Sequence, residues 1–233
     1  MKKPNQDQYY LDVEADNFFK RNPYDFERLS EKKREFLDFF MKDLKGAHLR
    51  NILEIGCHIG DLLNYAVNAF NAEKGWGIEP SRNAILEGNK RFSDRCNLFH
   101  GVIGDSDLVQ RIPICELVIV NDVFCWISRE TILQSIANID SVIAESGYLL
   151  IRDFLPDRHL RNQNHHITDV EVFCHKITGS HSGLFTQTGN YQVISSQIFT
   201  DNSNKLSKTQ QNGITASTEN RWLDILLQKQ WIE

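Results

Sequence analysis

The sequence is poor in several features that mark specialised classes of protein. Its five cysteines are an odd number, and no two of them stand in a C-x-x-C spacing. This argues against a disulfide scaffold and matches no familiar zinc pattern. Free thiols favour a reducing compartment, so we expect a cytoplasmic protein.

Long apolar runs and an excess of basic charge are also missing. The chain opens with Met-Lys-Lys-Pro-Asn, which has no apolar signal region, and no later run is long enough to span a bilayer. Lys and Arg total 26 against 31 Asp and Glu, a net charge of −5. No basic field favours nucleic acid. We therefore expect neither a membrane nor a nucleic-acid partner.

One stretch organises the rest of the chain. The apolar segment from Asn51 runs into a turn that contains Gly56 and Gly60, and a helix follows at once. The apolar residues of that helix recur at a period of 3.6. A strand, a glycine turn and a helix N-terminus together form half of a nucleotide-binding crevice.

The spacing within this turn narrows the ligand. It reads Glu54-x-Gly56-x-His58-x-Gly60, whereas a dinucleotide site needs G-x-G-x-x-G. A carboxylate before the turn suits a cationic amino group and would repel a pyrophosphate. An ordinary structural turn is the alternative interpretation.

Polar residues end the strands that follow. The segment Gly75–Glu79 predicts a short strand whose final carboxylate can accept both hydroxyls of a ribose. Pro80 then opens a helix. Asp105, after a third predicted strand, is a candidate acceptor for an adenine amine or an ordinary turn residue. A buried run, Glu116–Asn121, predicts a fourth strand that ends in Asn121-Asp122.

Strands and helices alternate from Asn51 to Asp153. This predicts an open, mostly parallel sheet with right-handed crossovers. We expect residues 1–45 to form a helical arm or lid and residues 46–233 the main domain. Segments 168–177 and 191–199 read as later strands, and a final helix is expected from about residue 218.

In this order the motifs resemble those of class I S-adenosylmethionine (SAM) dependent methyltransferases, whose first motif is E/D-x-G-x-G-x-G. The histidine at position 58 departs from that motif. The resemblance implies a Rossmann-like α/β fold, with a mostly parallel seven-stranded sheet, an antiparallel edge hairpin and helices on both faces. It also implies SAM as cofactor, held by Glu54, Gly56, Cys57, His58, Gly60, Glu79, Pro80, Asp105, Asn121 and Asp122.

The later part of the chain is loosely similar to small methyltransferases of bacterial polysaccharide and sugar-nucleotide biosynthesis. The similarity rests on scattered residues, among them Ile151–Pro156, His165-His166, Phe173–Lys176 and Gly189-x-Tyr191. It implies that the methyl group goes to a small molecule, a sugar or activated-sugar hydroxyl.

A hydroxyl acceptor needs a base, and histidine is the side chain best suited to take a proton near neutral pH. Five of the eight histidines lie between residues 159 and 181. We favour the adjacent His165 and His166, with Asp122 and Asp153 as alternatives. The two aspartates are also a weaker candidate pair for Mg²⁺, but we expect no metal.

Two other functions remain open from the sequence. One is a Rossmann-type NAD(P)-dependent oxidoreductase, because such enzymes use the same ribose carboxylate. The other is a non-catalytic SAM-binding or scaffold protein, because no catalytic residue is certain from sequence.

Overall fold

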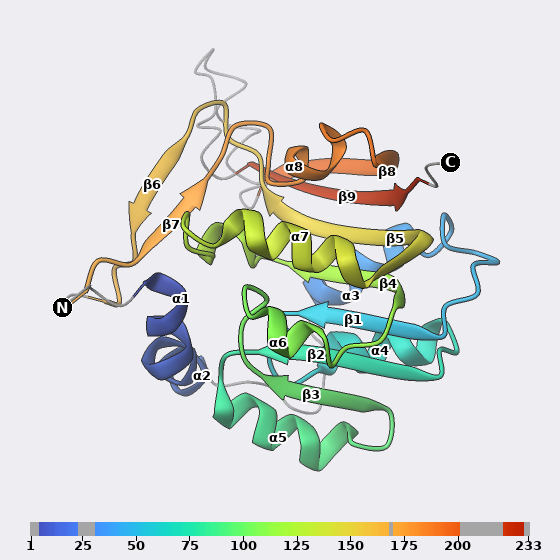
Figure 1. Cartoon of the computed structure of the whole chain (residues 1–233), viewed down its shortest axis with the longest axis horizontal. Helices are drawn as coiled ribbons and strands as arrows, with labels where there is room; N and C mark the ends of the chain where they lie inside the picture. The colour runs from blue at the N-terminus through green and yellow to red at the C-terminus, as the bar shows by residue number, and fades with distance from the viewer. Residues whose placement is uncertain (1–4, 23–30, 168–169, 201–220, 231–233) are drawn as a thin grey trace.

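The computed structural model describes residues 5–22, 31–167, 170–200 and 221–230. The chain forms nine strands and ten short or medium helices within these ranges (Figure 1). The elements in chain order are α1 (Gln6–Tyr9), η1 (Tyr10–Glu14), α2 (Ala15–Arg21), α3 (Glu31–Phe40), β1 (Asn51–Ile55), α4 (Asp61–Ala69), β2 (Lys74–Glu79), α5 (Arg82–Phe92), β3 (Cys96–His100), α6 (Ser106–Val109), β4 (Cys115–Asn121), η2 (Phe124–Trp126), α7 (Ile132–Val142), β5 (Ile143–Phe154), β6 (Leu160–Gln163), β7 (Phe173–Lys176), α8 (Gly183–Thr186), β8 (Tyr191–Thr200) and β9 (Arg221–Lys229).

Seven of the strands form one sheet in the order β3-β2-β1-β4-β5-β9-β8. Strands β3 to β5 pair in parallel, with Leu53 of β1 between Trp76 of β2 and Val118 of β4. Strands β9 and β8 run antiparallel at the far edge. The order reverses between β1 and β4, which is where open α/β sheets bind ligands. The predicted Rossmann-like sheet with an antiparallel edge is confirmed.

Helices cover both faces of the sheet through two separate apolar cores. One core joins α3, α4 and α5 to the sheet, with Phe36, Phe40 and Leu63 fully buried. The other joins α6 and α7 to the opposite face, with Ile139 and Phe124 fully buried. Burial on both faces explains why β4 reads as a continuous apolar run.

The first helices lie beyond the carboxyl ends of the parallel strands. In Figure 1 the arrowheads of β1 and β3 point toward α1 and α2. Helix α2 packs against α5. The π-helical turn η1 joins α1 to α2 without a break, a local geometry that is frequent at functional sites. Residues 5–21 are therefore positioned over the ligand-binding edge of the sheet.

The end of the chain differs from the sequence prediction. Residues 221–229 are not a helix but strand β9, which is inserted between β5 and β8. Its central residues are buried on both faces, so the strand lacks the alternation that identifies a half-exposed strand. Residues 173–176 form a strand within the predicted segment 168–177, but this strand, β7, pairs with β6 in a separate two-stranded sheet and does not join the antiparallel edge of the main sheet.

No helix in these described ranges is long and apolar enough to cross a membrane.

Candidate active site

The turn after β1 approaches its neighbours closely. Gly56 has a φ of +70°, and a Cβ added there would lie 2.4 Å from Val123 Cγ2, so both the backbone and the space require glycine. Its amide donates to the Ile78 carbonyl at 2.8 Å. His58 also lies in the left-handed region, with a φ of +52°, where the related motif has glycine. The turn therefore keeps its glycine-like backbone although it carries an imidazole.

Glu79 ties the β1 turn to the end of β2. Its two carboxylate oxygens accept hydrogen bonds from the amides of His58 at 2.9 Å and Ser81 at 2.8 Å. Burial raises the pKa of Glu79 to about 7, against the opposing effect of these two amides. Glu79 is thus a buried carboxylate at the carboxyl end of the second parallel strand.

Glu54 and Cys57 face inward, beneath the turn. Glu54 is 1% exposed, and burial raises its pKa well above the usual range. The amide of Leu63 in α4 donates to this carboxylate, and the oxygen Oε2 is buried without a partner among the described residues. Cys57 is fully buried, and burial likewise raises the pKa of its thiol. Neither side chain lines the adjacent cavity.

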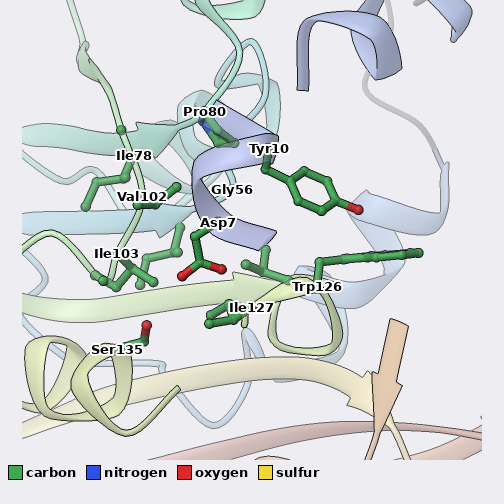
Figure 2. Close-up of a pocket in the computed structure, with 14 residues that line it drawn as sticks. Asp7, Tyr10, Gly56, Ile78, Pro80, Val102, Ile103, Trp126, Ile127 and Ser135 are labelled. Carbon is green, nitrogen blue, oxygen red and sulfur yellow. The ribbon is translucent and has the colours of Figure 1, made fainter. Parts of the chain in front are cut away.

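A cavity of about 80 Å³ lies at the carboxyl ends of the parallel strands (Figure 2). Its walls are mostly apolar. They come from the ends of β1 and β2, the loops after β3 and β4, helix α7 and the N-terminal arm. The lining residues are Asp7, Tyr10, Ile55, Gly56, Ile78, Pro80, Gly101, Val102, Ile103, Gly104, Val123, Trp126, Ile127 and Ser135.

The N-terminal arm (residues 5–21) closes one side of this cavity. The carboxylate of Asp7 points between Ile103 and Ile127 in Figure 2. It accepts hydrogen bonds from the Ser128 amide at 2.7 Å and from the Thr131 hydroxyl. Two residues at the start of the α7 segment thus hold the arm on that side.

Further contacts fix the arm at both ends. The carboxamide of Gln6 donates to the carbonyls of Trp126 at 2.6 Å and Phe173 at 2.8 Å, and it accepts from the Phe173 amide at 2.8 Å. At the other end, the rings of Phe18 and Phe19 lie 6.4 Å and 5.4 Å from the His58 ring. Burial lowers the pKa of His58 to about 4, so this imidazole is neutral at physiological pH.

A second group of polar residues lies at the ends of β4 and β5. Asp122 has a φ of +58°, and its amide donates to the Arg152 carbonyl at 3.0 Å. Its side chain reaches solvent although protein surrounds it on most sides. That surrounding protein, and then the carboxylate of Asp153, raise the pKa of Asp122 to about 7. Asn121 is half-buried as the last residue of β4.

Asp153 is fully buried and contacts a histidine that the sequence did not single out. Its Oδ2 lies 2.7 Å from Nδ1 of His181 and accepts from the His181 amide at 2.9 Å and the Ser180 hydroxyl at 3.0 Å. The imidazole of His181 stacks on Phe124, with ring centroids 5.6 Å apart and planes at 20°. Nothing in the sequence marks His181 above the other histidines, because its partner lies 28 positions away.

The favoured histidines are placed differently. His165 and His166 are exposed in the turn after β6, with ring centroids 3.9 Å apart. Neither lines the cavity. The turn is nevertheless tied to the arm, because Asn164 accepts from the His166 amide at 3.0 Å and shares a side-chain hydrogen bond with Tyr10.

The other predicted residues divide into two groups. Gly56 and Pro80 line the cavity, whereas Glu79, which directly precedes Pro80, is not among the lining residues. Asp105 is exposed, and its carboxylate caps α6 by accepting from the amides of Asp107 at 3.0 Å and Leu108 at 3.2 Å. The ordinary turn interpretation therefore describes Asp105. No group of three or more potential metal ligands is found in the part of the chain that the structure describes.

Comparisons with known proteins agree with this geometry. A family model described as a methyltransferase domain matches residues 22–189. No curated protein matches the sequence.

Solved structures share the fold at low identity. A 1,6-didemethyltoxoflavin N1-methyltransferase from Burkholderia thailandensis, with its substrate and S-adenosylhomocysteine (SAH) bound, superposes with a TM-score of 0.69 at 12% identity, covering 99% of this chain and 94% of that one. The N-methyltransferase NodS from Bradyrhizobium japonicum, in complex with SAH, gives 0.58 at 15% identity, with coverages of 97% and 99%. The StiE O-methyltransferase segment gives 0.60 at 16% identity, with coverages of 92% and 80%.

The matched region begins directly after the arm and includes the glycine turn, Glu79 and the ends of β4 and β5. The chain belongs to the methyltransferase-domain family and is a class I SAM-dependent methyltransferase.

Proposed function

We propose that this methyltransferase transfers the methyl group of SAM to a hydroxyl of a small, sugar-like acceptor. The charge of the site is the observation that supports SAM as the cofactor. Three carboxylates lie at the carboxyl ends of the parallel strands: Glu79 ends β2, Asp122 directly follows β4, and Asp153 is near the end of β5. The nearby cation Lys33 lies 2.8 Å from Asp61. Such a site favours a cationic sulfonium ligand over an anionic dinucleotide.

The residues at this edge fit the parts of SAM. Apolar walls from Pro80, Val102 and Ile103 suit an adenine ring, and the Glu79 carboxylate suits a ribose diol. The bare backbone of Gly56 allows a ligand to pass close to the turn. Asn121 and Asp122, at the end of β4, suit the polar methionine end. When bound, SAM supplies an electrophilic methyl group.

The arm serves in this proposal as a cover for the cofactor. The cavity of about 80 Å³ is well below the 300–1,000 Å³ typical of ligand pockets. Asp7 and Tyr10 of the arm form part of its wall. The arm must therefore shift to admit SAM, and it excludes water once it has closed again. Exclusion of water strengthens the electrostatic interactions inside such a site.

The proposed acceptor rests on the structural neighbours and on the sequence resemblance of residues 151–191. The structural neighbours include both N- and O-methyltransferases, so the fold does not select the acceptor atom. The toxoflavin enzyme acts on a small molecule, which supports that class of substrate here. The sugar-like character comes from the sequence resemblance of residues 151–191 alone.

Two measurements test the proposal. Isothermal titration should show binding of SAH and none of NAD. Wild-type protein incubated with trideuteromethyl-SAM and a panel of nucleotide-activated sugars should yield a labelled product in mass spectrometry. Binding of NAD without SAH would overturn the cofactor assignment. If a mixed metabolite extract instead yielded a labelled amine and no labelled sugar, an amine would replace the sugar hydroxyl as the acceptor.

A further inference from the structure

The carboxyl end of β5 holds a buried carboxylate–imidazole pair. Asp153 is 0% exposed and His181 is 4% exposed. Three donors converge on one oxygen of Asp153, Oδ2, and the shortest contact is the 2.7 Å one to the imidazole Nδ1. A carboxylate cannot donate, so Nδ1 carries the proton in this contact. The pair therefore fixes the tautomer of His181.

The other ring nitrogen of His181 has no such contact. Nε2 has no hydrogen-bond partner among the described residues, and it is not among the polar atoms that are sealed from solvent. The side chain keeps 5% of its surface exposed. With the proton on Nδ1, Nε2 carries a lone pair that a molecule at this edge can reach. This is the arrangement in which a carboxylate orients an imidazole as a base.

The pair lies beside the cofactor edge rather than apart from it. Asp153 influences the pKa of Asp122, which ends the neighbouring strand β4. The imidazole stacks on Phe124, two residues after Asp122. The other oxygen of Asp153, Oδ1, is sealed from solvent and has no hydrogen-bond partner among the described residues.

We propose that His181 is the general base of the methyl transfer and that Asp153 is its positioning residue. This inference rests on the proposed function. It assigns to His181 the role of base that the sequence analysis gave to His165 or His166, both of which are exposed. In the step, the acceptor oxygen forms a bond to the methyl carbon as the bond between sulfur and that carbon breaks. The sulfur keeps the electron pair and becomes a neutral thioether. The hydroxyl proton passes to Nε2 of His181.

A purely structural role makes different predictions. Asp153 also anchors the turn that precedes α8, through the amide of His181 and the hydroxyl of Ser180. If that anchoring were the whole role, His181→Asn would be mild, because the Asn amide can replace Nδ1 as a donor. A general base cannot be replaced in this way, since Asn has no group at the position of Nε2.

The test compares initial rates of labelled product from trideuteromethyl-SAM and a deproteinised bacterial extract rich in nucleotide-activated sugars. His181→Asn should lower kcat by about two orders of magnitude or more. Its Kd for SAH and its urea midpoint should stay close to those of wild type. Asp153→Asn should lower kcat at least tenfold, because an amide can stabilise the wrong tautomer. The exposed His159→Asn is the matched control and should leave turnover unchanged.

Two further measurements keep the outcomes separate. Imidazole added to His181→Gly should restore part of the rate, because free imidazole can act as the missing base. A side chain that only stabilises the fold would not be rescued in this way. Long-range nitrogen–proton spectra should show the His181 proton on Nδ1, whether or not an acceptor is known. A proton on Nε2, or a His181→Asn rate within threefold of wild type, overturns the inference. Wild-type protein that binds SAH but labels nothing overturns the proposed acceptor chemistry instead, and the base assignment with it.

Discussion

Asp16 of the arm accepts a 2.7 Å hydrogen bond from the hydroxyl of Ser81, the residue that caps α5. The same carboxylate oxygen accepts from the Asn83 amide at 3.0 Å. Asp16 therefore supplies a second cap to α5 from a separate segment of the chain. Since α5 begins directly after Glu79 and Pro80, this contact links the position of the arm to the cofactor edge.

Asp16→Ala should loosen the arm without unfolding the domain. Loss of these hydrogen bonds costs about 1 kcal/mol, which corresponds to roughly a fivefold larger open population. Amide exchange of residues 6–21 should speed up, and SAH should dissociate faster in stopped-flow measurements. Asp12→Ala is the control, because Asp12 is exposed and bonds only within the arm, to Gln8 at 2.9 Å. Equal SAH dissociation rates in the two variants would show that the arm does not control the release of the cofactor.

Gly56→Ala should impair both folding stability and SAH binding. The new Cβ would meet Val123 Cγ2 at 2.4 Å, and the φ of +70° is strained for alanine. Such backbone strain costs about 1–3 kcal/mol. Gly46→Ala separates the two effects, because Gly46 has a φ of +89° and nothing within 4 Å of an added Cβ. We expect Gly46→Ala to lose stability in urea unfolding while SAH affinity in isothermal titration stays unchanged. SAH affinity that survives Gly56→Ala would exclude the turn from the cofactor site.

The sequence predicts the cofactor half of this site better than the acceptor half. Gly56 and Glu79 belong to short-range features, a turn and the end of a strand, which leave a local pattern, whereas Glu54 of the same motif is buried and does not line the cavity. Asp153 and His181 meet only because the turn before α8 returns to the end of β5. Spacing gives no sign of that contact. Among five neighbouring histidines, adjacency favoured His165 and His166, yet both are exposed.

The same limit applies to the fold. The parallel strands β1 to β5 are each followed by a turn or helix signal, and a mostly parallel sheet could be predicted from them. Strand β9 could not, because both of its faces are covered and its apolar residues fall at helical spacing as readily as at strand spacing. Asp224 in this strand is fully buried. Its burial is explained by Arg152, which pairs with it across β5 and β9 but lies 72 positions away in the sequence.

Asp224→Ala should be among the most destabilising single substitutions in the sheet. Asp224 accepts two hydrogen bonds of 2.7 Å from the Arg152 guanidinium and a third of 2.9 Å from Gln197. The guanidinium also lies 4.5 Å and 5.0 Å from the ring centres of Phe36 and Phe199. Removing one partner of a buried ion pair typically costs about 3–5 kcal/mol.

Urea unfolding of Asp224→Ala measures this cost. The matched control is Asp157→Ala, since Asp157 pairs with Arg221 at 2.5 Å but is 63% exposed. Exposed pairs contribute only about 0–1 kcal/mol. A loss at Asp224 as small as that at Asp157 would contradict the burial of this end of β9.

Glu79→Gln should change the pH dependence of stability in a defined direction. Burial raises the pKa of Glu79 from 4.5 to about 7 in the folded protein. A raised pKa means that the folded state holds this proton more tightly than the unfolded state does. The stability that it contributes is full below pH 4.5 and is lost as the pH rises to about 7. The glutamine variant cannot ionise, so it should not lose stability through this residue.

Unfolding free energies in urea at pH 5 and pH 8 test this sign. The introduced glutamine resembles the protonated carboxyl, so the two proteins should be similar at pH 5, and the variant should be the more stable at pH 8. The gap at pH 8 should be at most about 3 kcal/mol for this size of shift. SAH affinity should fall in the same variant, because an amide cannot accept both hydroxyls of a ribose as the carboxylate can. If the variant is more stable at pH 8 but binds SAH as well as wild type, Glu79 is a buried structural acid and does not bind the cofactor.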